Sequence, residues 1–88
     1  MITRAQLQDV DEFLSQHPVD ESSVMALRRQ FPDIHFTYCL DDDVVAVDPL
    51  HEAEDFNLYL IDSRNHCLGF TRDLDVATGI VVAEIEAA

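Results

Sequence analysis

Residues Ile34–Leu40 read IHFTYCL, and this stretch decides the fold. Apolar side chains occupy every second position, namely Ile34, Phe36, Tyr38 and Leu40. Small or polar residues stand between them, namely His35, Thr37 and Cys39. This period of two predicts a β-strand with one buried face. The predicted strand separates a helical first third of the chain from a β-rich remainder.

Two amphipathic helices are predicted before this strand, over residues 3–31. Thr3 followed by Gln6 has the spacing of a capping box, which marks a helix start. Pro18 ends the first helix, and Asp20 is placed to cap the second. Apolar side chains recur with helical spacing in both segments: Leu7, Val10 and Leu14, then Val24, Leu27 and Phe31. We expect the two helices to pack as an antiparallel hairpin.

The remainder of the chain predicts further strands. Residues 57–62 (NLYLID) favour a strand, and residues 67–71 are placed to return beside it as a hairpin. Asp48 and Pro49 resemble the start of a short helical turn. Residues 73–86 fit either a helix, from the spacing of their apolar residues, or a turn followed by a strand from Gly79. We expect the turn and the strand.

These elements predict a single α+β domain over residues 1–88. The helical hairpin (3–31) is expected to pack on one face of a mainly antiparallel sheet of three to five strands, built from residues 34–86. A chain of 88 residues is long enough for one thin core.

The composition narrows the classes of partner. Eighteen acidic residues face five basic ones, which leaves a net charge of -13. Such a chain repels phosphate backbones and anionic lipid headgroups, so neither nucleic acid nor a membrane is expected as a partner. A basic protein surface would be attracted. Because no apolar run approaches the ~20 residues of a membrane span, a cytoplasmic location is expected.

The alternation of the strands predicts an interaction surface. We expect one sheet face to meet the helices through Phe36, Tyr38, Leu58, Leu60, Leu68, Phe70, Val81 and Ile85. The opposite face then carries Cys39, Tyr59, Ile61, Cys67, Ile80 and Val82, which are mostly uncharged and therefore favour a covered face. A second copy, another protein or the chain's own tail, folded as a helix, would each cover it. The predicted interaction surface comprises Cys39, Tyr59, Ile61, Cys67, Asp41, Asp42 and Asp43.

Metal binding is an alternative use of the same face. His35, Cys39, His66 and Cys67 supply imidazole and thiol groups of the kind that bind zinc or iron. Their spacing fits no established site, and buried cysteines and single histidines most often have structural roles. No cofactor is predicted.

An enzyme is the third class. The chain has two glycines and hence no glycine-rich phosphate loop. A nucleophilic cysteine needs nearby positive charge to lower its pKa, and this chain is strongly negative. We therefore expect no catalytic residues.

Three segments resemble a small family of uncharacterised acidic bacterial proteins associated with nitrogen-fixation gene neighbourhoods. They are FPDIHFTYC (31–39), FNLYLIDSRNHC (56–67) and TRDLDVATGIVVAE (71–84). The resemblance implies an accessory role, such as handling nitrogenase or its metal cofactor, and carries over no functional residue. The sequence as a whole predicts a non-catalytic accessory or interaction module that binds a protein partner or a second copy of itself.

Overall fold

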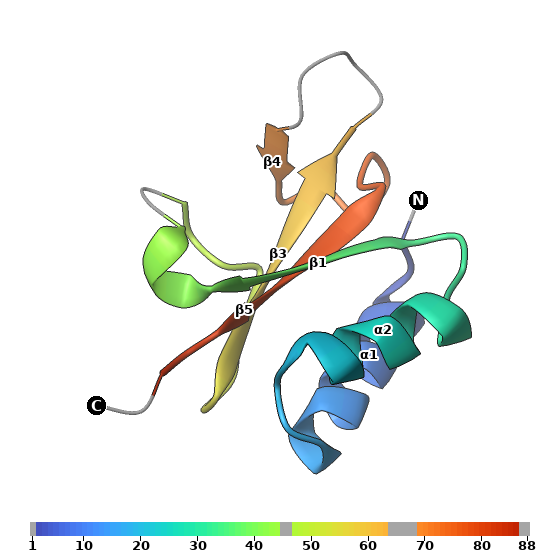
Figure 1. The fold of residues 1–88 in the computed structure, drawn as a ribbon. Coiled ribbons are helices and arrows are strands. Elements are labelled where there is room, and N and C mark those ends of the chain that lie inside the picture. Colours follow the sequence, from blue (N-terminus) through green and yellow to red (C-terminus); the bar gives the residue numbers. More distant parts are fainter. Residues whose placement is uncertain (1, 45–46, 64–68, 87–88) are drawn as a thin grey trace.

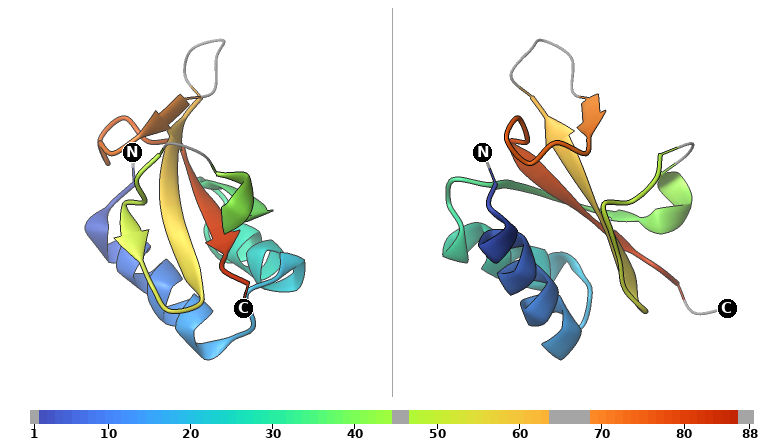
Figure 2. Two further views of the ribbon diagram at one scale, coloured as in Figure 1. Left: turned by 90° about the vertical axis from the view of Figure 1, so that its left-hand side faces the viewer. Right: turned by 180° about the vertical axis from the view of Figure 1, so that it is seen from behind.

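The computed structural model describes residues 2–44, 47–63 and 69–86. Two helices come first in the chain, and a five-stranded sheet follows (Figure 1). Both helices lie on the same side of the sheet, as the two views in Figure 2 show. The predicted α+β architecture is therefore confirmed.

The helices begin where their capping residues predict. Helix α1 spans Arg4–Gln16, and the Thr3 hydroxyl accepts from the Gln6 N–H at 3.0 Å while the Gln6 side chain accepts from the Thr3 N–H at 2.9 Å. Helix α2 spans Glu21–Gln30, and the Asp20 carboxylate accepts from the Ser23 N–H at 3.0 Å. Each cap satisfies N–H groups that a helix start leaves without partners. Neither helix has the length and apolar character needed to cross a membrane.

The sheet is mixed but mostly antiparallel. Its strands are β1 (His35–Leu40), β2 (His51–Glu52), β3 (Phe56–Asp62), β4 (Gly69–Thr71) and β5 (Gly79–Glu84). Their order is β1-β5-β3-β2, and β4 also pairs with β3. Only the β1–β5 pair is parallel among the pairs that the described residues form. A short 3-10 helix, η1 (Asp41–Asp43), follows β1 directly.

The main core lies between the helices and the sheet. The helices, together with the residue that precedes the α1 N-cap, contribute buried Ile2, Val10, Leu14, Val24 and Leu27. The strands contribute buried Phe36, Phe56, Leu58, Leu60, Ile80 and Val82. At about 25 cal/mol per Å² of apolar surface removed from water, this burial is the main stabilising contribution in a domain of this size.

The expected facing of β5 and β4 was wrong. Ile80 pairs with Phe36 on one side and with Leu60 on the other, so it shares their helix-facing side, as does Val82. Val81 instead lies in the cluster on the opposite face. Phe70 pairs with Ile61 and packs edge-on against Tyr59, so it too lies on that opposite face. Leu68 and Cys67 lie outside the described residues.

Two further expectations concern the tail of the chain and the residues after Pro49. The tail forms strand β5 after a turn, as expected, and the alternative of a tail helix covering the sheet is wrong. The helical turn expected after Pro49 is also wrong, because residues 51–52 form strand β2. The Leu50 N–H donates to the Leu58 carbonyl at 2.9 Å, and the Ala53 N–H donates to the Phe56 carbonyl at 2.9 Å. Pairing along β3 therefore outweighs the helix-start signal of Asp48 and Pro49.

The two glycines provide a matched test of this packing. A Cβ at Gly79 would lie 2.6 Å from the His35 carbonyl oxygen and 3.0 Å from the Ile61 side chain, whereas one at Gly69 would meet nothing within 4 Å. We expect Gly79→Ala to lower the free energy of unfolding by about 2 kcal/mol. The added methyl group would push the β5 backbone away from the β1 backbone at His35. Gly69→Ala should change it by less than ~0.5 kcal/mol. Urea unfolding of both variants checks this, and equal effects would contradict it.

Candidate functional site

The face of the sheet that points away from the helices, here called the outer face, has a small core of its own. Tyr59, Val81 and Ala83 are buried there. Cys39 of β1 and Ile61 of β3 pack against this cluster. Val44 and Val47, which follow η1 in the chain, pack against it as well. Figure 2 shows η1 on the opposite side of the sheet from the helices. The chain therefore covers part of its own outer face, with the segment that follows β1.

One carboxylate fixes this covering segment in place. Asp41 accepts a hydrogen bond from the Tyr59 hydroxyl at 2.8 Å and another from the Asn57 side-chain amide at 3.0 Å. Its carbonyl accepts from the Val44 N–H at 3.0 Å, which closes η1. Asp41 is half-buried, while Asp42 and Asp43 are exposed. Of the predicted acidic triplet, Asp41 is thus structural, and the other two carboxylates face solvent.

The environment of the outer face raises the pKa of two of its groups, Tyr59 and Cys39. Burial, followed by the hydrogen bond to Asp41, raises the pKa of Tyr59 to about 12. Burial, followed by the negative charges of Asp43 and Asp41, raises the pKa of the Cys39 thiol. A thiol with a raised pKa has little thiolate at neutral pH, so Cys39 is a poor nucleophile and a poor metal ligand.

The part of the outer face that stays open is centred on a residue that the sequence analysis placed on the wrong side. The Phe70 side chain is 48% exposed, and its ring packs edge-on against Tyr59 with 5.8 Å between ring centroids. A small pocket of about 330 Å³ lies beside it, lined by Val47, Asp48, Phe70, Thr71 and Arg72. An exposed aromatic ring held against a buried one is a typical anchor of a protein interface.

The remaining predicted residues lie on the outer face, at the start of β1 or outside the described residues. Tyr59, Ile61 and Cys39 lie together on the outer face, as predicted, although Tyr59 is only 4% exposed. His35 is exposed at the start of β1. His66 lies outside the described residues, as Cys67 does. Among the residues that the structure does describe, no three His, Cys, Asp or Glu side chains are close enough together to hold a metal ion.

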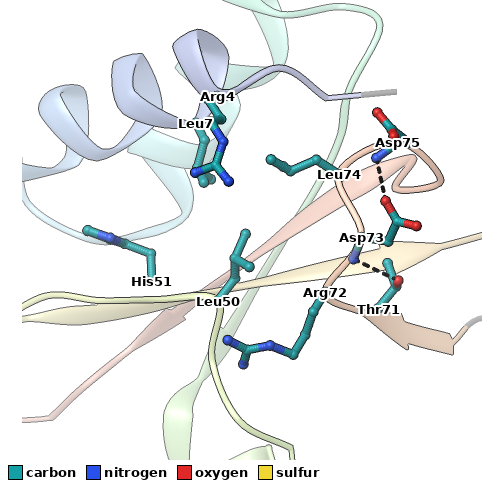
Figure 3. Close-up of a pocket in the computed structure, with 9 residues that line it drawn as sticks. All are labelled: Arg4, Leu7, Leu50, His51, Thr71, Arg72, Asp73, Leu74 and Asp75. Atoms are coloured by element: carbon teal, nitrogen blue, oxygen red, sulfur yellow. Dashed lines mark hydrogen bonds between the residues drawn. The ribbon is translucent and has the colours of Figure 1, made fainter.

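A groove beside the end of β4 forms a second candidate site. It has a volume of about 860 Å³ and lies between the start of α1, strand β2 and the turn after β4 (Figure 3). Its lining residues are Arg4, Leu7, Leu50, His51, Thr71, Arg72, Asp73, Leu74 and Asp75. Cavities of this size typically hold small molecules.

The polar groups of this groove are held in defined positions. Arg72 donates to the carbonyl oxygens of Pro49 at 3.1 Å and Asp48 at 3.4 Å. His51 Nε2 lies 2.9 Å from an Asp11 carboxylate oxygen on α1. The Asp73 carboxylate accepts from the Asp75 N–H at 3.0 Å. The sequence analysis missed this groove, because its walls come from three segments that the sequence keeps far apart.

The fold and both candidate sites define a small α+β domain with a partly self-covered sheet, an exposed aromatic ring and a polar groove. Within that class, the chain belongs to a family of unknown function, DUF6129, whose family model matches residues 6–85. The family match carries no statement about nitrogen fixation. Comparison with curated proteins gave no match, and neither did comparison with solved structures.

The two tyrosines of the chain should report on this environment. A hydrogen bond to Glu84, followed by burial, raises the pKa of Tyr38 to about 12, the same value as for Tyr59. Folding therefore favours both neutral phenols. Their contribution to stability is complete below the ordinary pKa of 10.0 and is lost as pH rises from there to about 12. We expect tyrosinate absorbance to appear only near pH 12, together with alkaline loss of stability.

Two single substitutions test the Asp41 contribution. Asp41→Asn should lower the pKa of Tyr59, and it should lower the free energy of unfolding by about 1–2 kcal/mol because two hydrogen bonds to a charged group are weakened. Asp42→Asn, at an exposed neighbour, is the control and should leave both unchanged. A tyrosinate titration that is identical in both variants would contradict the assignment.

Cysteine reactivity gives a further measurement. In a Cys67→Ser background, alkylation of Cys39 at pH 8 should be at least about threefold slower than that of a free model thiol, because its raised pKa leaves less thiolate. Asp43→Asn should speed the reaction, while Asp42→Asn should not. Alkylation faster than the model thiol would show that the thiol is activated instead.

Proposed function

We propose that the protein is a non-catalytic interaction module that binds a basic protein partner through its outer face. The observation that carries this proposal is Phe70, an aromatic side chain that is 48% exposed on a face where the other large apolar groups among residues 2–44, 47–63 and 69–86 are buried or packed. A ring already held against Tyr59 loses little side-chain entropy when a partner covers it.

The charges around Phe70 favour a basic partner over a second copy. The exposed carboxylates of Asp42 and Asp43 follow β1 in η1, and the pocket beside Phe70 is lined by both Asp48 and Arg72. Two copies would each bring a net charge of -13 to the contact, whereas a basic surface would be drawn to it. Salt should therefore weaken the complex.

The absence of catalysis is part of the same proposal. It is supported by the raised pKa of the Cys39 thiol and by the structural role of Asp41. An accessory role in nitrogen fixation, which the resemblance of residues 31–39, 56–67 and 71–84 implies, would concern the identity of the partner. Metal handling remains the alternative, with His35 and Cys39 as its described candidates.

The chain offers a matched pair for testing the binding surface. Phe70 and Met25 are both large apolar residues that are 48% exposed, but Met25 lies on α2, within the helical layer. Phe70→Ser should weaken capture of the partner from native extract by at least about tenfold, as expected for an interface anchor. Met25→Ser should leave it unchanged. Captured proteins are compared by quantitative mass spectrometry at low and high salt.

Two controls make this result interpretable. Unfolding curves of both variants show whether either change affects the fold, and sedimentation velocity shows whether the protein alone self-associates. Equal capture by both variants would contradict the proposed surface. A concentration-dependent dimer that Phe70→Ser dissociates would replace the basic partner with a second copy.

A further inference from the structure

We propose that the groove between α1, β2 and the turn after β4 binds a small organic anion, whose charge is received by the guanidinium groups of Arg4 and Arg72. The inference concerns a different surface and ligand from the proposed protein-binding role of the outer face. It rests on where the few basic side chains of an acidic protein are placed.

Basic residues are scarce, yet two of them line the same groove. The structure describes four of the five arginines: Arg4, Arg28, Arg29 and Arg72. Arg28 lies 4.0 Å from Glu21 and donates to the Phe36 carbonyl, so it serves the contact between α2 and β1. Arg4 and Arg72 both line the groove of about 860 Å³ between α1, β2 and the turn after β4. In the part of the chain that the structure describes, neither forms an ion pair, although acidic residues outnumber basic ones more than threefold.

Arg72 is positioned without being neutralised. Its guanidinium donates to the carbonyl oxygens of Asp48 and Pro49, and these acceptors carry no net charge. The side chain is thus held in place while its positive charge remains available. A guanidinium fixed in this way loses less conformational entropy when it binds a carboxylate or a phosphate.

Three leucine side chains line the groove together with the two arginines. Figure 3 shows the Arg4 guanidinium beside Leu7, the Leu74 side chain extending toward them, and Leu50 between Arg4 and Arg72. A ligand that reaches both arginines therefore crosses leucine side chains. This arrangement suits an anion with an apolar body, such as an aliphatic dicarboxylate, better than a bare inorganic ion.

The acidic residues of the lining do not neutralise these arginines. Asp73 is engaged with the backbone N–H of Asp75, and Figure 3 shows both carboxylates at the far end of the groove from His51, turned away from the two guanidinium groups. Asp11 does not line this groove, and its carboxylate is bound to His51, which does. These carboxylates would repel a highly charged polyanion, so they limit the ligand to an anion of low charge.

The test uses heteronuclear NMR titrations of the full chain with four probes: suberate, succinate, inorganic phosphate and the neutral diol of the same length as suberate. Suberate at millimolar concentration should shift the signals of Leu50, His51 and residues 71–75. Succinate and phosphate should bind more weakly, and the diol should not bind. Absence of localised shifts with suberate, or equal shifts with the diol, overturns the proposal. Phosphate bound as tightly as suberate shows an adventitious ion only and also overturns it.

Arginine variants assign the binding to the groove. Arg4→Gln and Arg72→Gln should each weaken suberate binding by about tenfold or more, since each removes a charge-assisted hydrogen bond. Arg29→Gln changes an exposed arginine on α2 that does not line the groove, and it should have no effect. A loss in Arg29→Gln equal to that in Arg4→Gln would reduce the effect to net charge and overturn the assignment.

The outcome is separable from that of the proposed protein partner. Phe70 does not line the groove, so Phe70→Ser should keep suberate binding even where it abolishes capture of the partner. Arg4 does not belong to the outer face, so Arg4→Gln should keep capture of the partner. Unfolding curves of each variant exclude a general loss of structure.

Discussion

Strand β5 is the constraint on which the rest of the structure depends. It pairs with β1 on one edge and with β3 on the other, and five of its six residues are buried. Its side chains supply both clusters, with Ile80 and Val82 toward the helices and Val81 and Ala83 toward the outer face. Such a strand needs a covering layer on each side. The helices supply one layer, and another part of the chain has to supply the second.

The path of the chain explains where that second layer comes from. Strand β1 lies at one edge of the sheet and β2 at the other, so residues between them must cross β5 and β3. The helices already occupy one face, and the crossing therefore runs over the outer face, where Val44 and Val47 pack. The hydrogen bonds from Tyr59 and Asn57 to Asp41 fix the start of this crossing. The acidic residues of η1, Asp41–Asp43, thus lie on the outer face because of the strand order.

The features that sequence predicted well are local ones. The capping residues Thr3 and Asp20 act within one helical turn, so they marked both helix starts correctly. The facing of β5 could not be deduced, because a run of apolar residues buried on both sides has no alternation from which to read it. Pairing with β1 and β3 sets that phase, and pairing with Ile61 likewise sets the face of Phe70. Cys39, Tyr59 and Ile61 were assigned correctly because their strands do alternate.

The two candidate sites meet at Arg72, which could not have been inferred from sequence order. Arg72 lines both the groove and the pocket beside Phe70, and its hydrogen bonds hold the end of the crossing segment at Asp48 and Pro49. The scarcity of basic residues was visible in the composition. That Arg4 and Arg72 line one groove depends on the fold, which brings the start of α1 and the end of β4 together beside β2. An anion bound in the groove would offset the positive charge of Arg72. It would therefore change the electrostatic potential at Phe70, beside which Arg72 also lies. By thermodynamic linkage, a basic partner bound at Phe70 would alter the affinity of the groove by the same factor. One arginine thus provides a physical route by which two separate surfaces of a small domain would influence each other.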